Sequence, residues 1–202
     1  KFLLAYLIFG VFGFIIVSSF VSQTTYNRLV KEKASALYRE ANLIANTYAV
    51  DLYTKDRALS DVKEQMDLLA SFMPATIWII NPSGRMIMAT DKPIDVENPI
   101  IVQGFDPTII GEEKYTIGTF FDSFSDEQLS VFAPIVAEFK VNGYVVIHCS
   151  MDSIEKQSDD FLAISYLLLV ILFVISLIIL FFFTEMVYFP LKKITEATEQ
   201  YA

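Results

Sequence analysis

Two long apolar segments near the ends of the chain dominate its hydrophobicity pattern. Residues 2–21 and residues 161–184 contain no charged side chain. About 20 apolar residues cross a bilayer core of about 30 Å as a helix, so we predict transmembrane helices at residues 1–22 and 161–184. For the first, a cleaved signal peptide is the alternative, although Val17 to Ser22 offers a poor cleavage site. For the second, the alternative is a buried core helix, which the lack of a polar stripe disfavours.

The segment between them, residues 23–160, has the size of one domain and begins with a helical pattern. Apolar residues recur at steps of three and four from Thr24 to Leu52, namely Tyr26, Val30, Ala34, Leu37, Ala41, Ile44 and Tyr48. No Gly or Pro separates this stretch from the first apolar segment, so we predict one continuous helix. A second helix is predicted from about Ser60, and Pro74 stops it.

After Pro74 the pattern changes to that of β-strands. We predict five strands, at residues 76–80, 85–90, 115–121, 129–139 and 144–150. Asn142-Gly143 predicts a tight turn between the last two. The Pro- and Gly-broken segment from Asp91 to Gly111 predicts a loop with one helical turn, which covers one sheet face and leaves a pocket. Helices followed by antiparallel strands predict an α+β domain with its long helix on the other face.

Charge and composition narrow the functional classes. The net charge is −9, and no basic stripe exists that would bind nucleic acid. Lys1 before the first apolar segment and Lys192 and Lys193 after the second favour cytoplasmic termini and an extracytoplasmic middle. The single cysteine, Cys149, excludes an intramolecular disulfide and is predicted to be buried. With His148 as the only histidine, we predict no Cys/His metal cluster and no cofactor.

Three stretches of the middle segment resemble the PAS-like Cache sensory domains of bacterial receptors. Residues 76–90, with the turn Asn81-Pro82-Ser83-Gly84, look like the strand–turn–strand of that family. Leu129 to Ile135 resembles its Ala-Pro-Ile strand, and Gly143 to Ile147 resembles its returning strand. The resemblance implies a single Cache domain at residues 23–160, in which a long N-terminal helix precedes an antiparallel five-stranded sheet.

The end of the chain resembles the opening of a HAMP relay domain. That family places a proline just after the last span, as Pro190 does here, and then an apolar heptad pattern. The corresponding residues here are Leu191, Ile194, Thr198 and Tyr201. The resemblance implies that residues 185–202 begin a cytoplasmic relay in which Pro190, Leu191 and Ile194 take part, and we expect the rest of the relay to follow. A generic juxtamembrane helix is the alternative.

No catalytic constellation is present in the 202 residues: we find no Gly-rich phosphate loop, nucleophile elbow or His/Asp/Ser arrangement. Candidate ligand-binding residues are Trp78, Tyr144 and His148. Tyr144 and His148 share a strand face. His148 either points into a pocket or is a hydrogen-bonded core histidine, and Trp78 either stacks on a ligand or packs in the core. The pattern favours the core role for His148 and Trp78.

Arg85 and Lys92 flank the first predicted hairpin and complete the set of candidate ligand-binding residues. Cache receptors for carboxylates and amino acids often use such cations against a ligand carboxylate. Solvated surface charge is the favoured alternative, because no full ligand motif of that family is present. Asp152, with Glu155 three residues later, predicts the start of an exit helix that runs directly into the second apolar segment. The acidic group on this helix either binds a divalent or polycationic ligand or forms a solvated face, which is favoured; it consists of Asp152, Glu155, Asp159 and Asp160.

Together these features predict the sensory and transmembrane region of a two-component sensor histidine kinase in the cell membrane. We expect a homodimer that binds an unidentified small-molecule or cationic ligand and acts on a response regulator through further cytoplasmic domains. The alternatives are the sensor of a methyl-accepting chemotaxis receptor, that of a cyclic-dinucleotide enzyme, and a membrane-tethered binding protein without signalling output. The sequence beyond Ala202 would separate these outputs.

Overall fold

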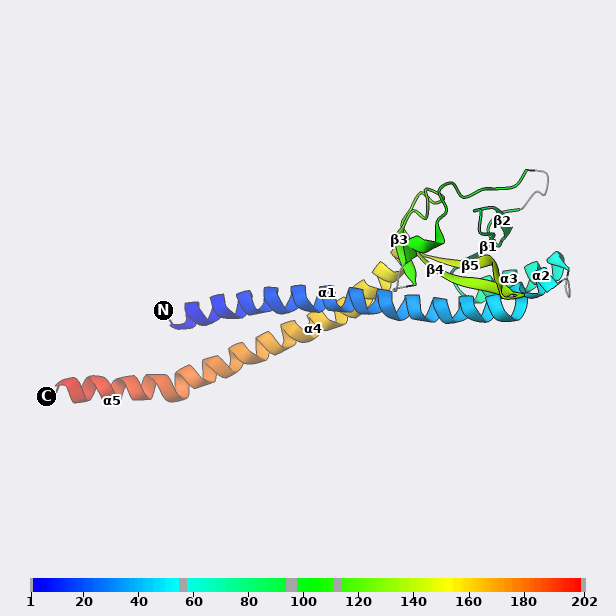
Figure 1. Cartoon of the computed structure of the whole chain (residues 1–202). Coiled ribbons are helices and arrows are strands. Elements are labelled where there is room, and N and C mark those ends of the chain that lie inside the picture. Colours follow the sequence, from blue (N-terminus) through cyan, green and yellow to red (C-terminus); the bar gives the residue numbers. More distant parts are fainter. Residues whose placement is uncertain (1, 55–57, 94–97, 111–113, 201–202) are drawn as a thin grey trace. The chain divides into compact units, whose positions relative to one another are not determined.

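A computed structural model describes residues 2–54, 58–93, 98–110 and 114–200 of the chain (Figure 1). Its contacts divide the chain into two compact units: residues 26–157, which we call the sensor unit after the role predicted above, and residues 1–25 with 158–202, called the apolar unit. Three helices precede the sheet: α1 (Phe2–Ile44), α2 (Asp51–Thr54) and α3 (Leu59–Phe72). A π-helical turn at Ala45–Ala49 follows α1. The predicted uninterrupted helix from the apolar segment into the domain is thereby confirmed.

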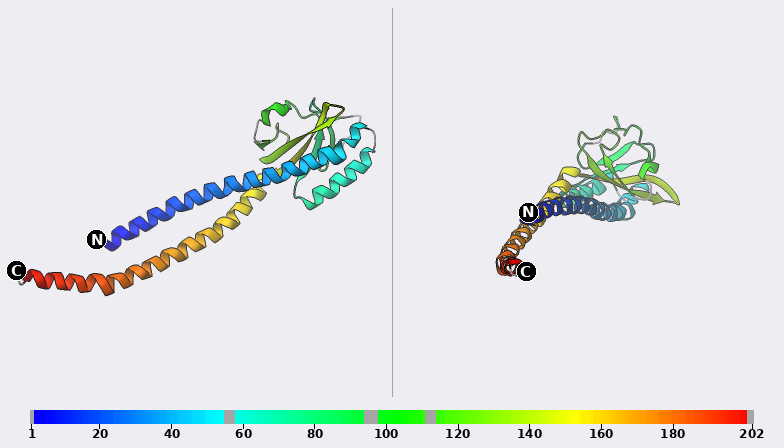
Figure 2. Two further views of the ribbon diagram at one scale, coloured as in Figure 1. Left: turned by 60° about the horizontal axis from the view of Figure 1, so that its bottom comes forward. Right: turned by 90° about the vertical axis from the view of Figure 1, so that its left-hand side faces the viewer.

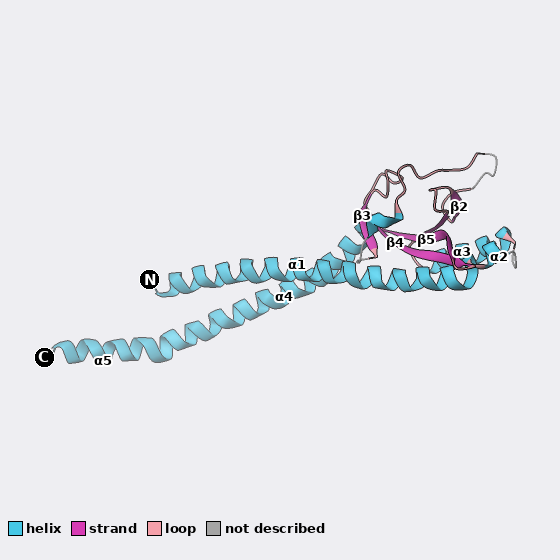
Figure 3. Ribbon diagram, viewed as in Figure 1, coloured by secondary structure: helices cyan, strands magenta, loops and turns pink. Residues whose placement is uncertain are grey.

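Five strands form one antiparallel sheet in the order β2-β1-β5-β4-β3, which confirms the predicted α+β class (Figure 3). Their bounds are β1 (Thr76–Ile80), β2 (Met86–Ala89), β3 (Tyr115–Gly118), β4 (Gln128–Ala137) and β5 (Lys140–Ser150). A short 3-10 turn, η2 (Pro107–Ile110), lies in the predicted loop. The central strand β5 pairs with both β1 and β4, as in Ile147 opposite Ile77 and Val131. β5 is therefore the strand that joins the two halves of the sheet.

One face of the sheet packs on α1 and α3 and forms what we call the helix-face core (Figure 2). Alternate residues of each strand point to it, as the two-residue period of a strand requires. Small residues such as Ala34, Ala41 and Ala45 let the helix approach the sheet closely, and larger aliphatic residues fill the remaining space. The buried strand residues include Ile77, Ile79, Leu129, Val131, Ile135, Val145, Ile147 and Cys149. Burial of Cys149 agrees with its prediction.

The other face carries the loop-face core, which is rich in aromatic residues. Trp78, Phe132 and Val146 project from the strands, and loop residues cover them. The covering residues are Ile100, Val102, Phe105, Phe120, Phe121 and Phe124. This confirms that the segment after Asp91 covers a sheet face, although residues 94–97 and 111 of that segment lie outside the described residues.

Gly84 fixes this loop to the β1–β2 turn. Its φ of +84° belongs to the left-handed region that glycine tolerates. A Cβ atom at this position would lie 2.8 Å from the carbonyl oxygen of Val102 and 3.0 Å from Cβ of Phe105. Because Gly84 lacks that atom, the Val102 amide can donate a hydrogen bond of 2.9 Å to the Gly84 carbonyl. The Asn81-Pro82-Ser83-Gly84 turn thus holds the loop as well as reversing the chain.

The turn between β4 and β5 does not lie at Asn142-Gly143, so this prediction is wrong. Glu138 and Phe139 form the turn instead, with φ of +53° and +62°. Asn142 falls at a register shift between the strands, and Gly143 pairs with Ile135. A Cβ atom on Gly143 would lie 2.7 Å from Oη of Tyr53 and 2.9 Å from the Ile80 carbonyl oxygen. The glycine is therefore required by close packing inside the sheet and not by a turn.

Helix α4 (Met151–Phe183) begins at the residue after β5 and runs through the second apolar segment. By length and composition, two helical stretches of the described chain are able to cross a membrane, Tyr6–Tyr53 and Met151–Ile194. Within the apolar unit, the hydroxyl groups of Tyr6 and Ser176 form a hydrogen bond. Such a bond suits an apolar environment, where an unpaired hydroxyl group is costly.

A π-helical turn at Thr184–Tyr188 precedes α5 (Phe189–Gln200). Pro190 has no N–H to donate to the carbonyl four residues earlier, and a π-helical turn is a common way to accommodate such a break. Leu191 and Ile194 are exposed on α5. The predicted seam residue Tyr201 and the side chain of Thr198 lie outside the described part of the chain.

Candidate functional site

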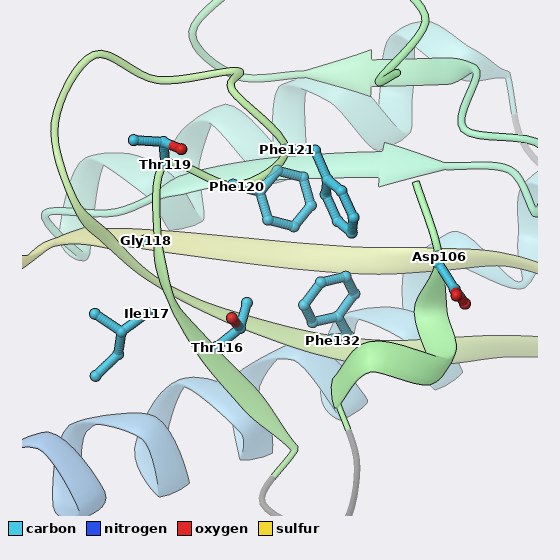
Figure 4. A pocket seen from close by; sticks show the side chains of 8 residues that line it. All are labelled: Asp106, Thr116, Ile117, Gly118, Thr119, Phe120, Phe121 and Phe132. Carbon is cyan, nitrogen blue, oxygen red and sulfur yellow. The ribbon is translucent and has the colours of Figure 1, made fainter. Parts of the chain in front are cut away.

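The loop face of the sensor unit contains a cavity of about 190 Å³ (Figure 4). Strand β3 and the residues after it form one wall, and Asp106, next to η2, lies across from them. Phe132 enters from β4, and Figure 4 shows its ring facing those of Phe120 and Phe121. Among the described residues, the lining consists of Asp106, Thr116, Ile117, Gly118, Thr119, Phe120, Phe121 and Phe132. The cavity thus combines aromatic rings, two threonines and one carboxylate.

The aromatic wall stands on an unusual backbone. Phe120, Phe121 and Asp122 are consecutive and have φ of +46°, +51° and +56°. The left-handed region costs a non-glycine residue about 1–2 kcal/mol, so three in a row require compensation. Part of it comes from hydrogen bonds of 3.1 Å that the Ser123 and Phe124 amides donate to the Thr119 carbonyl. Burial of the Phe120 ring in the loop-face core supplies more.

His148 lies directly behind this wall and is buried. Its ring centroid is 4.4 Å from those of both Trp78 and Phe120 and 4.8 Å from that of Phe124. Its Nδ1 atom shares a hydrogen bond of 2.8 Å with the Ser130 hydroxyl on the paired strand β4. Burial, and secondly the positive charge of Lys92, lower the pKa of His148 to about 3. The imidazole is therefore neutral at physiological pH.

The second ring nitrogen of His148, Nε2, is buried without a hydrogen-bond partner in the described structure. If the Ser130 hydroxyl donates to Nδ1, the proton of the neutral ring is on Nε2. That N–H then faces an aromatic enclosure, in which Trp78 and Phe120 are inclined at 66° and 69° to the imidazole. Negative ring faces accept weak N–H contacts, which favours this tautomer. His148 is thus the polar centre of an otherwise aromatic layer.

Trp78 links the layer to the β2 end of the sheet. Its indole N–H donates a hydrogen bond of 2.6 Å to Asp91 Oδ1, and its ring stacks on Phe124 at a centroid distance of 4.9 Å. The Lys92 ammonium group lies 4.7 Å above the Trp78 ring and 5.7 Å from the centre of the Phe124 ring. Lys92 is also 4.0 Å from the Asp91 carboxylate. These contacts engage Lys92 over the outside of the aromatic layer.

The structure brings together some of the residues that the sequence suggested. Trp78, Lys92 and His148 form one connected group, and Tyr144 is half-buried in the same core, where its ring lies 5.9 Å from that of Phe105. Arg85 is exposed at the end of the β1–β2 turn and belongs to no described contact with this group. None of these five residues lines the cavity. Their role in ligand binding therefore remains a prediction.

Sequence reasoning predicted a pocket on this face but missed most of the residues that line it, because the pattern placed a strand at residues 115–121 and a polar turn at residues 122–127. The available signal was the density of aromatic residues, Phe120, Phe121 and Phe124, in a segment that also contains acids. Phenylalanine side chains are usually buried, so three of them in one segment indicate that it packs against the protein. Strand β3 also ends earlier than predicted, at Gly118, which frees the phenylalanines to fold over the sheet.

The acidic group on the exit helix has no metal-site geometry. Within the described residues, no three His, Cys, Asp or Glu side chains are placed to hold a metal ion. Asp152, Glu155, Asp159 and Asp160 are all exposed on α4. A cationic ligand at this group remains a prediction.

No protein-family model and no curated protein sequence matches the chain. Among solved structures, the chain is similar to the sensor domain of the V. cholerae histidine kinase DctB, at 12% identity and a TM-score of 0.47 over 66% of this chain and 56% of that one. The ligand-binding domain of the Campylobacter jejuni chemoreceptor Tlp3, in complex with 4-methylisoleucine, gives 10% identity and a TM-score of 0.47 over 71% and 61%. A domain of a putative sensory box/GGDEF family protein from Vibrio parahaemolyticus gives 10% and 0.40 over 66% and 62%. The chain thus spans less than two thirds of each of these structures.

Proposed function

We propose that this chain is the sensory and transmembrane region of a two-span receptor, and that the receptor is a sensor histidine kinase in the cell membrane. The sensor unit lies outside the cytoplasm, binds a small molecule, and passes the binding signal through the membrane helices. The resemblance of residues 24–160 to Cache domains and of the Pro190 segment to a HAMP opening supports this type of receptor.

The observation that carries the proposal is the direct connection of the sensor unit to both apolar helices. Helix α1 continues without a break from the apolar segment to residues buried in the sensor unit, such as Leu37 and Ala41. At the other end, β5 finishes at Ser150 and α4 starts at Met151, with no linker between them. A binding protein that is only tethered to a membrane needs no such rigid connection. A receptor needs it, because a flexible linker would absorb any small displacement.

A continuous set of contacts joins the cavity to this connection. Phe120 lines the cavity and contacts His148, and His148 lies on β5 three residues before α4 begins at Met151. A ligand that changes the position of the Phe120 ring would therefore act on the strand that leads into the membrane helix. Such a signal is a shift between two packings, limited by the difference in the ligand's affinity for them.

The relay end of the chain fits the same function. Pro190 and the π-helical turn before it mark a change of helix after the second apolar segment. The three-residue spacing of Leu191 and Ile194 suits a coiled-coil seam between two copies of the chain. We propose that the receptor is a homodimer, that both termini are cytoplasmic, and that the signal reaches a response regulator through the cytoplasmic kinase.

A reporter fusion tests the proposal. Residues 1–202 are fused to the relay and kinase domains of a well-characterised histidine kinase that drives a transcriptional reporter. The fusion point keeps the helical phase of α5. We expect Phe120→Ala to shift the basal output several-fold, because it removes the contact between the cavity and His148. The matched control is Ile117→Ala, which changes an exposed lining residue without touching His148.

Membrane insertion is checked in the same cells by alkaline extraction and by labelling with a membrane-impermeant maleimide. A Ser125→Cys variant should react in intact cells, and a Lys193→Cys variant only after permeabilisation. Equal output from the wild type, F120A and I117A, with normal insertion, would refute signalling through this route. Labelling of Lys193→Cys in intact cells would refute the orientation.

A further inference from the structure

The cavity on the loop face has a definite chemical character, and the following inference about its ligand rests on the proposed sensory function. Its described lining residues include three phenylalanines, two threonines and one charged residue, Asp106. No lysine or arginine is among the described lining residues. The site is therefore aromatic with a net negative charge.

Asp106 remains ionised across the physiological pH range. The side-chain hydroxyl of Thr108 donates a hydrogen bond of 2.7 Å to Asp106 Oδ1, and the Thr108 amide donates one of 2.8 Å. These two hydrogen bonds, the side-chain bond first, lower the pKa of the Asp106 carboxyl group. They also fix the orientation of the carboxylate, whose oxygens point away from the phenylalanine rings in Figure 4, so that Asp106 acts on a ligand as a charge at the rim.

The nearest lysines along the chain are occupied elsewhere. Lys92 lies over Trp78 and Phe124, and the Lys114 ammonium group lies 4.7 Å above the ring of Tyr38, which packs against the helix-face core. By sequence, residues 94–97 and 111–113, which the structure does not describe, contain no lysine or arginine. An anionic ligand would therefore meet Asp106 without a cation to balance its charge.

A cationic ligand meets the opposite situation. The rings of Phe120, Phe121 and Phe132 pack together, with centroid distances of 5.1 and 5.4 Å from Phe120 to the other two, and form an aromatic surface that attracts an alkylammonium group. Asp106 supplies a full negative charge at the rim. A methylated ammonium group also has apolar surface that aromatic walls desolvate at little cost. Thr116 and Thr119 can bond a hydroxyl or carbonyl group on the same molecule.

The volume limits the size of the ligand. A cavity of about 190 Å³ corresponds to roughly six water molecules at about 30 Å³ each. That is smaller than the about 300–1,000 Å³ of pockets for drug-sized molecules. We propose that the cavity of Asp106, Thr116, Phe120, Phe121 and Phe132 binds a small organic ammonium ion, with Asp106 as the counter-charge at its rim and the phenylalanine rings as the aromatic wall on which the cation lies.

The test compares three probes of one shape and different charge on the full chain in detergent micelles or nanodiscs. Choline is the cation, 3,3-dimethylbutanol is its neutral isostere, and 3,3-dimethylbutyrate is an anion of similar shape. Trp78, the only tryptophan, reports binding through its fluorescence, since it lies edge-on to Phe120 at a centroid distance of 5.7 Å. We expect choline to bind at least about tenfold more tightly than the alcohol, and the carboxylate not to bind.

Two variants locate the interaction. Asp106→Asn keeps an oxygen that can accept the Thr108 hydrogen bonds and removes the charge, so we expect choline affinity to fall about tenfold. Asp126→Asn removes an exposed carboxylate that does not line the cavity and should leave affinity unchanged. An unaltered melting temperature of D106N confirms that folding is intact, and Asp106→Glu should recover part of the affinity.

The outcomes separate this inference from the sensory function. Equal affinity for choline and the neutral alcohol, preference for the carboxylate, or unaltered affinity in D106N would each overturn the ammonium ligand. In those cases a reporter shift in F120A still supports the sensor. Conversely, choline binding that depends on Asp106 supports the ligand class whatever the reporter shows. An unchanged reporter in F120A would then count only against the proposed signalling route.

Discussion

The two faces of the sheet share the same five strands but differ in the side chains and in the backbone that cover them. The helix-face core is formed by aliphatic residues and alanines from regular elements, including Ala41, Val131 and Ile147. The loop-face core is formed by aromatic rings on irregular backbone, and it contains the buried polar pair Ser130 and His148. Within the described residues, the three consecutive left-handed residues Phe120, Phe121 and Asp122 and the cavity of the candidate site lie on the loop face.

Under the proposed function, the helix face provides stability and the loop face senses the ligand. A close-packed aliphatic interface between helices and sheet tolerates little change, so it fixes the framework. Loops that store strain and enclose space can change with little loss of packing, which is where ligand-responsive segments are expected. The cavity thus lies on the adaptable face, while β5 belongs to both faces and connects them.

The largest expected effect is on the helix face. Ile147→Ala removes buried side-chain volume between β1 and β4, and we expect it to lower the free energy of unfolding by about 3 kcal/mol. Phe121→Ala on the loop face removes more atoms, but its ring is only partly buried, so we expect a loss of about 1 kcal/mol. Urea unfolding of the full chain in micelles, followed by Trp78 fluorescence, measures both. A larger loss for F121A would invert the assignment of the two faces.

An intermediate effect concerns the buried histidine of the loop face. The pKa of His148 is about 3 in the folded protein and close to 6.5 when unfolded. Between these values the unfolded chain binds the additional proton, so the folded state loses stability as pH falls below about 6.5, by up to about 1.4 kcal/mol per pH unit. His148→Gln cannot take up this proton. We expect H148Q to lose less stability than the wild type between pH 6.5 and 4.5.

The carboxyl groups of the chain also titrate in this range, so the relevant quantity is the difference between wild type and H148Q at each pH. Ser130→Ala provides a control, because it removes the hydrogen bond to Nδ1 and leaves the titratable ring in place. It should lower stability at every pH and preserve the slope. Parallel curves for the wild type and H148Q would show that His148 is not buried in the neutral form.

The smallest effect is expected at the tip of the β4–β5 hairpin, where no packing contact in the described part of the chain offsets the backbone strain. Glu138 and Phe139 have positive φ, and the Phe139 side chain is fully exposed. The double substitution E138N/F139G supplies residues suited to this conformation, and we expect a gain of about 1 kcal/mol. Val136→Gly, in the neighbouring part of β4, should lower the free energy of unfolding by about 1 kcal/mol. A lower free energy of unfolding in E138N/F139G would contradict this expectation. It would indicate that the exposed Phe139 ring packs against a second molecule.

Much of the framework followed from the sequence. The helix from the first apolar segment into the domain, the strand–turn–strand at 76–90 and the two faces of β5 were predicted, because the periods of 3.6 and 2 are local properties. The hairpin turn was misplaced because Asn-Gly is a strong local signal that tertiary packing overrode. At Gly143 the approach of Tyr53 and Ile80 excludes any side chain, and no local pattern records such an approach.

The candidate site was the least predictable part. Trp78, Lys92 and His148 were identified as residue types with chemical potential, but their meeting depends on pairing between strands 70 residues apart in sequence. The cavity depends on how two loops fold over the sheet. Sequence alone determined the two apolar segments, the order of helices and strands, and the inward and outward alternation of the strands, since these depend on neighbours along the chain. Only the tertiary structure decided that Phe120 stands between a cavity and a buried histidine, because that arrangement arises from residues brought together by packing.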